Sequence, residues 1–135
     1  MWDHLQEERL ARSPFPPHGR IPNFKGAERA AERLFEHPLV RTAKRIKVNP
    51  DAPQRKVREL ALRRGITLFV PTPRLRGGFR MFDPENIPVN EIAEAVSLSG
   101  ANRWGKAVAL DQLPRMDFIV AGSVAVTRDG RRCGR

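Results

Sequence analysis

The sequence contains one cysteine, Cys133, in 135 residues, and this scarcity excludes two classes of protein. A single cysteine cannot form a disulfide within the chain, so the chain is not a small disulfide-stapled domain. A cysteine-rich zinc site is excluded for the same reason, and the three histidines lack metal-ligand spacing. So little cysteine fits the cytoplasm, where we expect the protein to act.

Long apolar runs are also missing. No stretch approaches the roughly 20 apolar residues that a membrane-spanning helix needs. The first thirteen residues, MWDHLQEERLARS, are charged and lack the apolar core of a signal peptide. We therefore expect no membrane partner. We also expect the protein to be a monomer.

Acidic residues are scarce relative to basic ones. The 25 Lys and Arg residues outnumber 15 Asp and Glu residues, which leaves a net charge of +10. This excess predicts an anionic partner, and a merely solvated basic surface is the alternative. Nucleic acid is one such partner, but tyrosine is absent, the only aromatic residues are seven Phe and two Trp, and no nucleic-acid-binding motif is found. Nucleic acid therefore stays the second choice behind small anionic ligands.

The residues that are present predict an α/β fold. Arg45–Val48 and Thr67–Pro71 read as strands, and the helical pattern between them extends to about Arg64, with Gly65 as its stop. This strand–helix–strand unit requires a right-handed crossover and two parallel strands. The most apolar strand candidate is MDFIVAG, and we expect Phe118–Ala121 to be a third, buried parallel strand of the same sheet.

The other expected elements follow from caps, prolines and apolar spacing. Residues 1–24 are expected to form a helix over His4–Arg12, capped by Asp3, and then a proline-rich extended segment. Residues 25–135 are expected to form the α/β domain. Its further elements are a helix over Gly26–His37, a short strand over Phe79–Phe82, a helix over Val89–Leu98 and a loop over SGANRWGK.

The last fourteen residues, GSVAVTRDGRRCGR, place glycines and arginines directly after the most apolar strand. Ligands bind at the carboxyl ends of strands in α/β sheets. Glycine lets backbone N–H groups approach phosphate oxygens, and arginine adds bidentate charged donors. On this pattern alone, a solvated basic tail is the alternative.

The segment IVAGSVAVTRDGRRCGR resembles the signature of the 5-formyltetrahydrofolate cyclo-ligase family, whose members are also called methenyltetrahydrofolate synthetases. In that family an apolar strand leads through a turn to G-x-R-x-G-R, and Gly130, Arg132, Gly134 and Arg135 fall on matching positions. The blocks RIPNFKGAERAAERL, IKVNPDAPQRKVRELALRRG and VPTPRLRGGFRMFDP resemble a divergent branch of the family. The resemblance covers the chain from Arg20 onward.

The resemblance implies a three-layer α/β/α, Rossmann-like domain with a mostly parallel sheet that is incomplete at its C-terminal end. The implied activity is ATP-dependent conversion of 5-formyltetrahydrofolate to 5,10-methenyltetrahydrofolate, with ATP and Mg²⁺ as cofactors and a reduced folate as substrate. The residues implied to bind the ATP phosphates are Gly130, Arg132, Cys133, Gly134 and Arg135. A non-catalytic relative that binds nucleic acid is the alternative, because Thr127 and Val126 replace an Asp and a Phe of the main branch.

Four residues are candidates for binding the folate. Asp51 and Gln54 follow a predicted strand and could bond the amide-like edge of the pterin, whereas helix capping is the alternative for Asp51. Arg74 lies in a turn after the next strand and could meet a phosphate or the glutamate tail, or could be an exposed loop residue. Arg135 could contact both ligands. No catalytic residue or metal ligand is assigned, and we expect the chain to continue past Arg135, because the family's loop is only half complete there.

Overall fold

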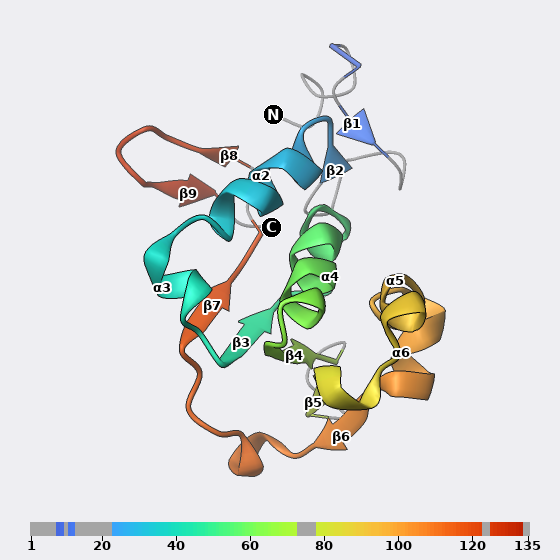
Figure 1. Cartoon of the computed structure of the whole chain (residues 1–135). Helices are drawn as coiled ribbons and strands as arrows, with labels where there is room; N and C mark the ends of the chain where they lie inside the picture. The colour runs from blue at the N-terminus through green and yellow to red at the C-terminus, as the bar shows by residue number, and fades with distance from the viewer. Residues whose placement is uncertain (1–7, 10, 13–22, 73–77, 123–124, 134–135) are drawn as a thin grey trace.

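The computed structural model describes residues 8–9, 11–12, 23–72, 78–122 and 125–133. Its centre is a five-stranded sheet in the order β6-β5-β4-β3-β7 (Figure 1). The strands are β3 (Arg45–Val48), β4 (Thr67–Pro71), β5 (Phe79–Phe82), β6 (Lys106–Val108) and β7 (Phe118–Val120). The fold class is therefore α/β, as the sequence predicts.

The three parallel strands are confirmed as neighbours. β3 pairs in parallel with β4, where Arg45 lies opposite Thr67, and with β7, where Ile46 lies opposite Phe118. β7 ends at Val120, one residue before the predicted end. Because these strands run in one direction, their carboxyl ends share one edge of the sheet.

The expectation of a mostly parallel sheet is wrong. β5 pairs antiparallel with β4, and β6 pairs antiparallel with β5, so half of the four pairings in this sheet are antiparallel. The cause is the short connection after β4, which ends at Pro71 while β5 begins at Phe79. A crossover between parallel strands needs a dozen or more residues. The connection from β4 to β5 is shorter than that, so the chain returns as an antiparallel strand.

The core lies between the sheet and two helices, α2 (Ala27–Leu34) and α4 (Arg55–Arg63), which contact each other. From the sheet, Ile46, Val48 and Leu68 are fully buried. α4 contributes the buried side chains Val57, Ala61 and Leu62. Gly65 follows α4 with a φ of +77°, the left-handed conformation that ends many helices, so the predicted stop is confirmed.

β7 is not the buried strand that its composition predicts. It is an edge strand that pairs with β3, and its Ile119 side chain is 61% exposed. Phe118 and Val120 are half-buried and pack against the core. An apolar run does not report its position in a sheet, which is why MDFIVAG reads as a central strand.

The helix predicted over Gly26–His37 ends early, at Leu34. A separate helix, α3 (Pro38–Arg41), then begins, and the Nδ1 atom of its cap residue His37 accepts a hydrogen bond from the Leu39 N–H at 3.2 Å. Proline disfavours helical geometry in the residue before it, so Pro38 separates the two helices.

The loop predicted over SGANRWGK is wrong, and the helix predicted before it is shorter than expected. α5 (Ile92–Ala95) is followed by α6 (Leu98–Trp104); α6 packs against α5, and α5 in turn contacts α4 (Figure 1). Ser97 caps α6, because its Oγ accepts the Gly100 N–H at 3.2 Å. This cap and the packing outweigh the low helix propensity of Gly100. The 3₁₀ turns of the described chain are η1 (Ala52–Gln54), η3 (Pro84–Asn86), η4 (Val89–Glu91) and η5 (Leu110–Gln112).

The helix predicted over His4–Arg12 is wrong where the structure describes it. Glu8 and Arg9 form a turn, and β1 (Ala11–Arg12) pairs antiparallel with β2 (Asn23–Phe24). Pairing with a distant segment has outweighed local helix propensity here. The rest of that helix and most of the proline-rich segment lie outside the described residues.

Candidate functional site

The segments that follow β3, β4 and β7 leave the sheet at one edge. β3 is followed by the turn Asn49–Gln54, β4 by the segment that begins at Thr72, and β7 by Ala121 and Gly122. Since the three strands are parallel neighbours, the topology brings these segments together, although they are far apart in the sequence. This is the edge where ligands bind in α/β sheets.

A cavity of about 650 Å³ lies beside the first of these segments. One wall comes from β2 and the start of α2, including Phe24, Gly26 and Arg29, and the other comes from η1 and α4. Gly26 has a φ of +96°, which an L-residue with a side chain rarely adopts. Glycine at this position therefore lets the chain turn directly into α2 at the cavity wall.

The cavity wall carries both signs of charge. Lys56 and Glu59 both line the cavity and pair at 3.2 Å, whereas Arg63, which does not line it, pairs with the other oxygen of Glu59 at 3.1 Å. Burial alone would raise the pKa of Glu59, but these two partners outweigh it and lower that pKa. Arg55 donates a hydrogen bond to the Ala93 carbonyl at 3.4 Å. The side chain of Arg29, which lines the cavity, forms no ion pair or hydrogen bond with other described residues, so its charge can serve an anionic ligand.

Asp51 occupies the cap position of η1, but its side chain accepts no capping hydrogen bond from that turn. The capping interpretation is therefore right for its position and wrong for its side chain. Gln54 ends the same turn and is 9% exposed. Within the described part of the chain, its Oε1 atom is buried without a hydrogen-bond partner. Such an acceptor costs about 1–3 kcal/mol, a cost that a ligand donor could remove. Neither Gln54 nor Asp51 lines the cavity, whose wall includes their neighbours Ala52 and Pro53.

Arg58 is a residue that the sequence analysis missed. It lies on α4 and is 6% exposed, and its Nη1 donates hydrogen bonds to the carbonyls of Asn49 at 2.8 Å and Asp51 at 2.9 Å. Burial lowers its pKa to about 10; the charge of Arg55 lowers it too, and that of Asp51 acts in the opposite direction. The signal in the sequence is its spacing, because Arg58 precedes Ala61 and Leu62 by three and four positions and so shares their buried face.

The glycine- and arginine-rich segment forms a β-hairpin where it is described. β8 (Ala125–Val126) pairs antiparallel with β9 (Arg132–Cys133), so Arg132 and Cys133 belong to a strand. In the turn between them, Asp129 accepts a hydrogen bond from Thr127 and pairs with Arg131 at 3.1 Å.

Gly130 in this turn has a φ of +93° and open space where a Cβ would stand. The described part is thus an exposed turn rather than an enclosed cradle. Gly134 and Arg135 lie outside the described residues, so the binding of ATP phosphates by this segment stays a prediction.

Arg74 also lies outside the described residues, but both ends of its loop are fixed. The N–H and Oγ1 of Thr72 donate hydrogen bonds to the Gly78 carbonyl at 3.1 and 2.9 Å. A Cβ on Gly78 would lie 2.5 Å from the Val108 carbonyl oxygen, so glycine is needed where β5 meets β6. The described residues on either side of the Arg74 segment are therefore joined by hydrogen bonds at the carboxyl edge.

The described residues include no group of three or more His, Cys, Asp or Glu side chains that could hold a metal ion, so the Mg²⁺ implied by the resemblance has no ready ligand set among them. No helix in the same part of the chain has the length and apolar character needed to cross a membrane.

Comparison with known proteins agrees with the resemblance. Residues 3–135 match the 5-formyltetrahydrofolate cyclo-ligase family. The methenyltetrahydrofolate synthase domain-containing proteins of Bos taurus and Mus musculus are each 41% identical over 137 residues, and that of Homo sapiens is 34% identical. These matches cover 100% of the chain but 36–37% of each relative, so the chain spans about a third of the length of these proteins.

Proposed function

Because the chain belongs to the 5-formyltetrahydrofolate cyclo-ligase family, we propose that it takes part in the ATP-dependent conversion of 5-formyltetrahydrofolate to 5,10-methenyltetrahydrofolate. The same membership leads us to propose a three-layer arrangement of helices around the mixed sheet, and a full-length protein that is cytoplasmic and monomeric. The observation that carries the proposal is the shared carboxyl edge, where the segments after β3, β4 and β7 meet.

The chemistry explains why two anionic ligands must lie close together. The formyl oxygen is a poor leaving group, so ATP first transfers its γ-phosphoryl group to that oxygen and leaves as ADP. N10 of the folate then attacks the formyl carbon, the N–C bond forms and N10 loses its proton to solvent, and the C–O bond breaks with release of phosphate. The protein must hold the γ-phosphate beside the formyl oxygen and stabilise the developing charge.

The two ligands are assigned to different segments of the edge. Asp51 and Gln54 would bond the pterin, with the 650 Å³ cavity beside their turn, and Arg74 would meet the folate from the loop after β4. The residues proposed to hold the ATP phosphates are Gly130, Arg132, Cys133, Gly134 and Arg135, with Arg135 also facing the folate. The net charge of +10 suits two polyanionic ligands.

The test uses the full-length protein, with methenyltetrahydrofolate formation followed by absorbance in the presence of ATP. Arg132→Ala should lower kcat on the order of 10²-fold, because it removes a donor that stabilises charge in the transition state. Arg131→Ala is the matched control, since Arg131 is engaged with Asp129 in the turn. Equal effects of the two substitutions would contradict the assignment of Arg132.

A nucleic-acid-binding relative without catalytic activity is the second candidate, and the net charge of +10 favours it. It would replace the first if the full-length protein shows no ATP-dependent cyclisation and binds RNA with an affinity that falls steeply with salt concentration.

A further inference from the structure

We propose that Arg58 is a positioning residue for folate recognition, which fixes the turn after β3 so that Asp51 and Gln54 can reach the substrate. This inference rests on the proposed function. It concerns a residue to which the resemblance assigns no role, and it arises from the hydrogen bonds of one buried side chain.

The guanidinium of Arg58 clamps the turn by its backbone. One nitrogen, Nη1, donates to the carbonyls of both Asn49 and Asp51, at 2.8 and 2.9 Å. These carbonyls lie two residues apart, on either side of Pro50, in the segment that leaves the carboxyl end of β3. A single donor group therefore sets the path of the chain at Asp51, the residue directly before η1.

The same guanidinium also reaches a second part of the fold. Its Nη2 donates a hydrogen bond at 3.5 Å to the carbonyl of Val96, the residue that directly follows α5. Arg58 thus ties the β3–α4 turn on one side to α5 on the other. Because the side chain is 6% exposed, these contacts are shielded from water. Charge-assisted hydrogen bonds are strongest in such a shielded environment.

A clamp of this kind acts on binding through the residues that the turn carries. Asp51 directly precedes η1 and Gln54 ends it, and Gln54 offers a buried acceptor that lacks a partner in the described part of the chain. Hydrogen-bonded recognition depends on placement, and a displacement of about 1 Å can cost on the order of 10²-fold in rate. Loosening the turn should therefore weaken binding of the folate, while ATP, assigned to the segment after β7, should be unaffected.

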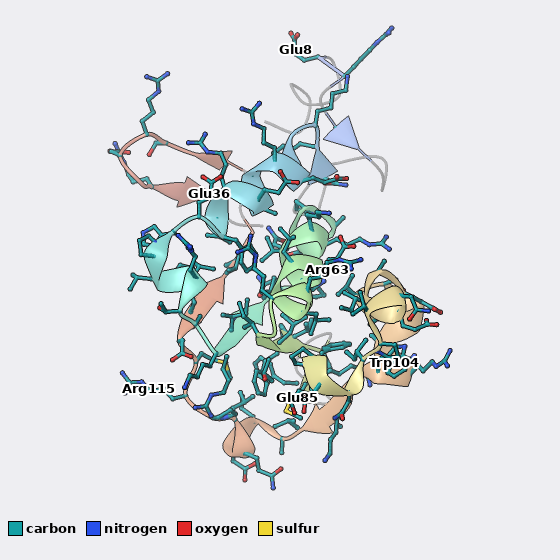
Figure 2. All side chains as sticks on the ribbon, viewed as in Figure 1. Glu8, Glu36, Arg63, Glu85, Trp104 and Arg115 are labelled. Atoms are coloured by element: carbon teal, nitrogen blue, oxygen red, sulfur yellow. The ribbon has the colours of Figure 1, made fainter. Side chains whose placement is uncertain are left out.

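The experiment compares three variants of the full-length protein in the cyclisation assay. Arg58→Met removes the charge and all the donors while keeping the apolar stem. Arg58→Lys keeps a cation that can donate a hydrogen bond to one carbonyl at a time. It also keeps the test possible if the Arg58→Met protein does not fold. Arg63→Met is the matched control, because Arg63 projects from the same helix (Figure 2) and its side chain is 38% exposed.

We expect Arg58→Met to raise the KM for 5-formyltetrahydrofolate about tenfold or more, while the KM for ATP changes less than about twofold. Arg58→Lys should give a smaller rise in the folate KM, and Arg63→Met none. A merely structural role would instead lower the active fraction, and with it kcat, without separating the two KM values. Equal changes in both KM values, or a fall in kcat alone, would overturn the proposal.

A double-mutant cycle tests the route of the effect. If Arg58 acts through the position of Asp51, then Asp51→Asn and Arg58→Lys should be less than additive in their effects on the folate KM. Full additivity would contradict the proposal. If the wild-type protein shows no turnover, the proposed function fails and the role of Arg58 fails with it. If the wild-type protein is active and both Arg58 variants keep its folate KM, the role of Arg58 alone is overturned.

Discussion

The carboxylate of Asp117 accepts a hydrogen bond at 2.9 Å from the backbone N–H of Lys44, which lies 73 positions earlier in the chain. The same oxygen accepts the N–H of Arg45 at 3.1 Å. Asp117 directly precedes β7 and Arg45 begins β3, so one side chain joins the starts of the two strands. The edge strand that leads to the glycine- and arginine-rich hairpin is thus held by a carboxylate as well as by its backbone pairing.

This contact predicts a pH dependence. The N–H groups of Lys44 and Arg45 hold the pKa of Asp117 below its ordinary value, and the charges of Arg45 and Arg115 add to the effect. A lowered folded-state pKa means that the contact stabilises the fold above the unfolded-state pKa, about 3.9, and is lost as the pH falls through the lower folded-state value. Asp117→Ala should therefore lower Tm at neutral pH, and the difference from wild type should shrink below about pH 4.

Asp111→Ala is the control for this measurement, because Asp111 is exposed in η5. Its substitution should leave the Tm profile close to that of wild type. A difference between Asp117→Ala and wild type that stays constant from neutral pH to pH 3 would show that the carboxylate charge has no part in holding β7.

The exposed side of β7 predicts self-association of the 135-residue chain. Ile119 is 61% exposed on an edge strand, and exposed apolar edges pair with other chains. Ile119→Lys should therefore reduce the apparent mass in light scattering at high concentration. Leu39→Lys is the matched control, because Leu39 is 64% exposed but lies in the helix α3 rather than on a strand. An equal reduction by both substitutions would mean that association depends on general surface charge rather than on the edge.

Two glycines should respond differently to substitution by alanine. A Cβ on Gly100 would collide with the Glu94 carbonyl oxygen and lie 2.9 Å from the Ala95 Cα, so α6 would have to move away from α5. Such overpacking typically costs about 1–3 kcal/mol. A Cβ on Gly65 would meet open space, so the only cost of alanine there is the strain of a side chain at a φ of +77°, about 1 kcal/mol. Urea unfolding should show the larger loss for Gly100→Ala; the reverse order would contradict the packing of α6 on α5.

The sequence predicted what depends on local pattern. Thr67–Pro71 and Phe79–Phe82 coincide with β4 and β5, and Gly65 ends the preceding helix as its position suggests. What it missed depends on packing between distant segments. The helix at Leu98–Trp104 forms against α5 despite Gly100, and β1 forms by pairing with β2.

The candidate site divides in the same way. Asp51 and Gln54 could be found because they follow a recognisable strand, and the structure places them in one turn. Arg58 could not be found by residue type, because arginine in a helix is normally exposed. Its burial arises only when two backbone carbonyls of the turn and the end of α5 meet around it.

Gln54 gives the last prediction, because its effects on stability and on binding should separate. Its Oε1 is buried without a partner among the described residues, so Gln54→Met removes an unsatisfied acceptor and keeps a side chain of similar shape. The free energy of unfolding should then stay the same or rise by up to about 1–2 kcal/mol. If that acceptor serves the pterin, the KM for 5-formyltetrahydrofolate of the full-length protein should rise about tenfold, the loss expected for one buried hydrogen bond of about 1.4 kcal/mol. Gln112→Met, at an exposed position in η5, should change neither quantity. A Gln54→Met protein that is both destabilised and normal in its folate KM would show that Gln54 supports the fold and does not read the substrate.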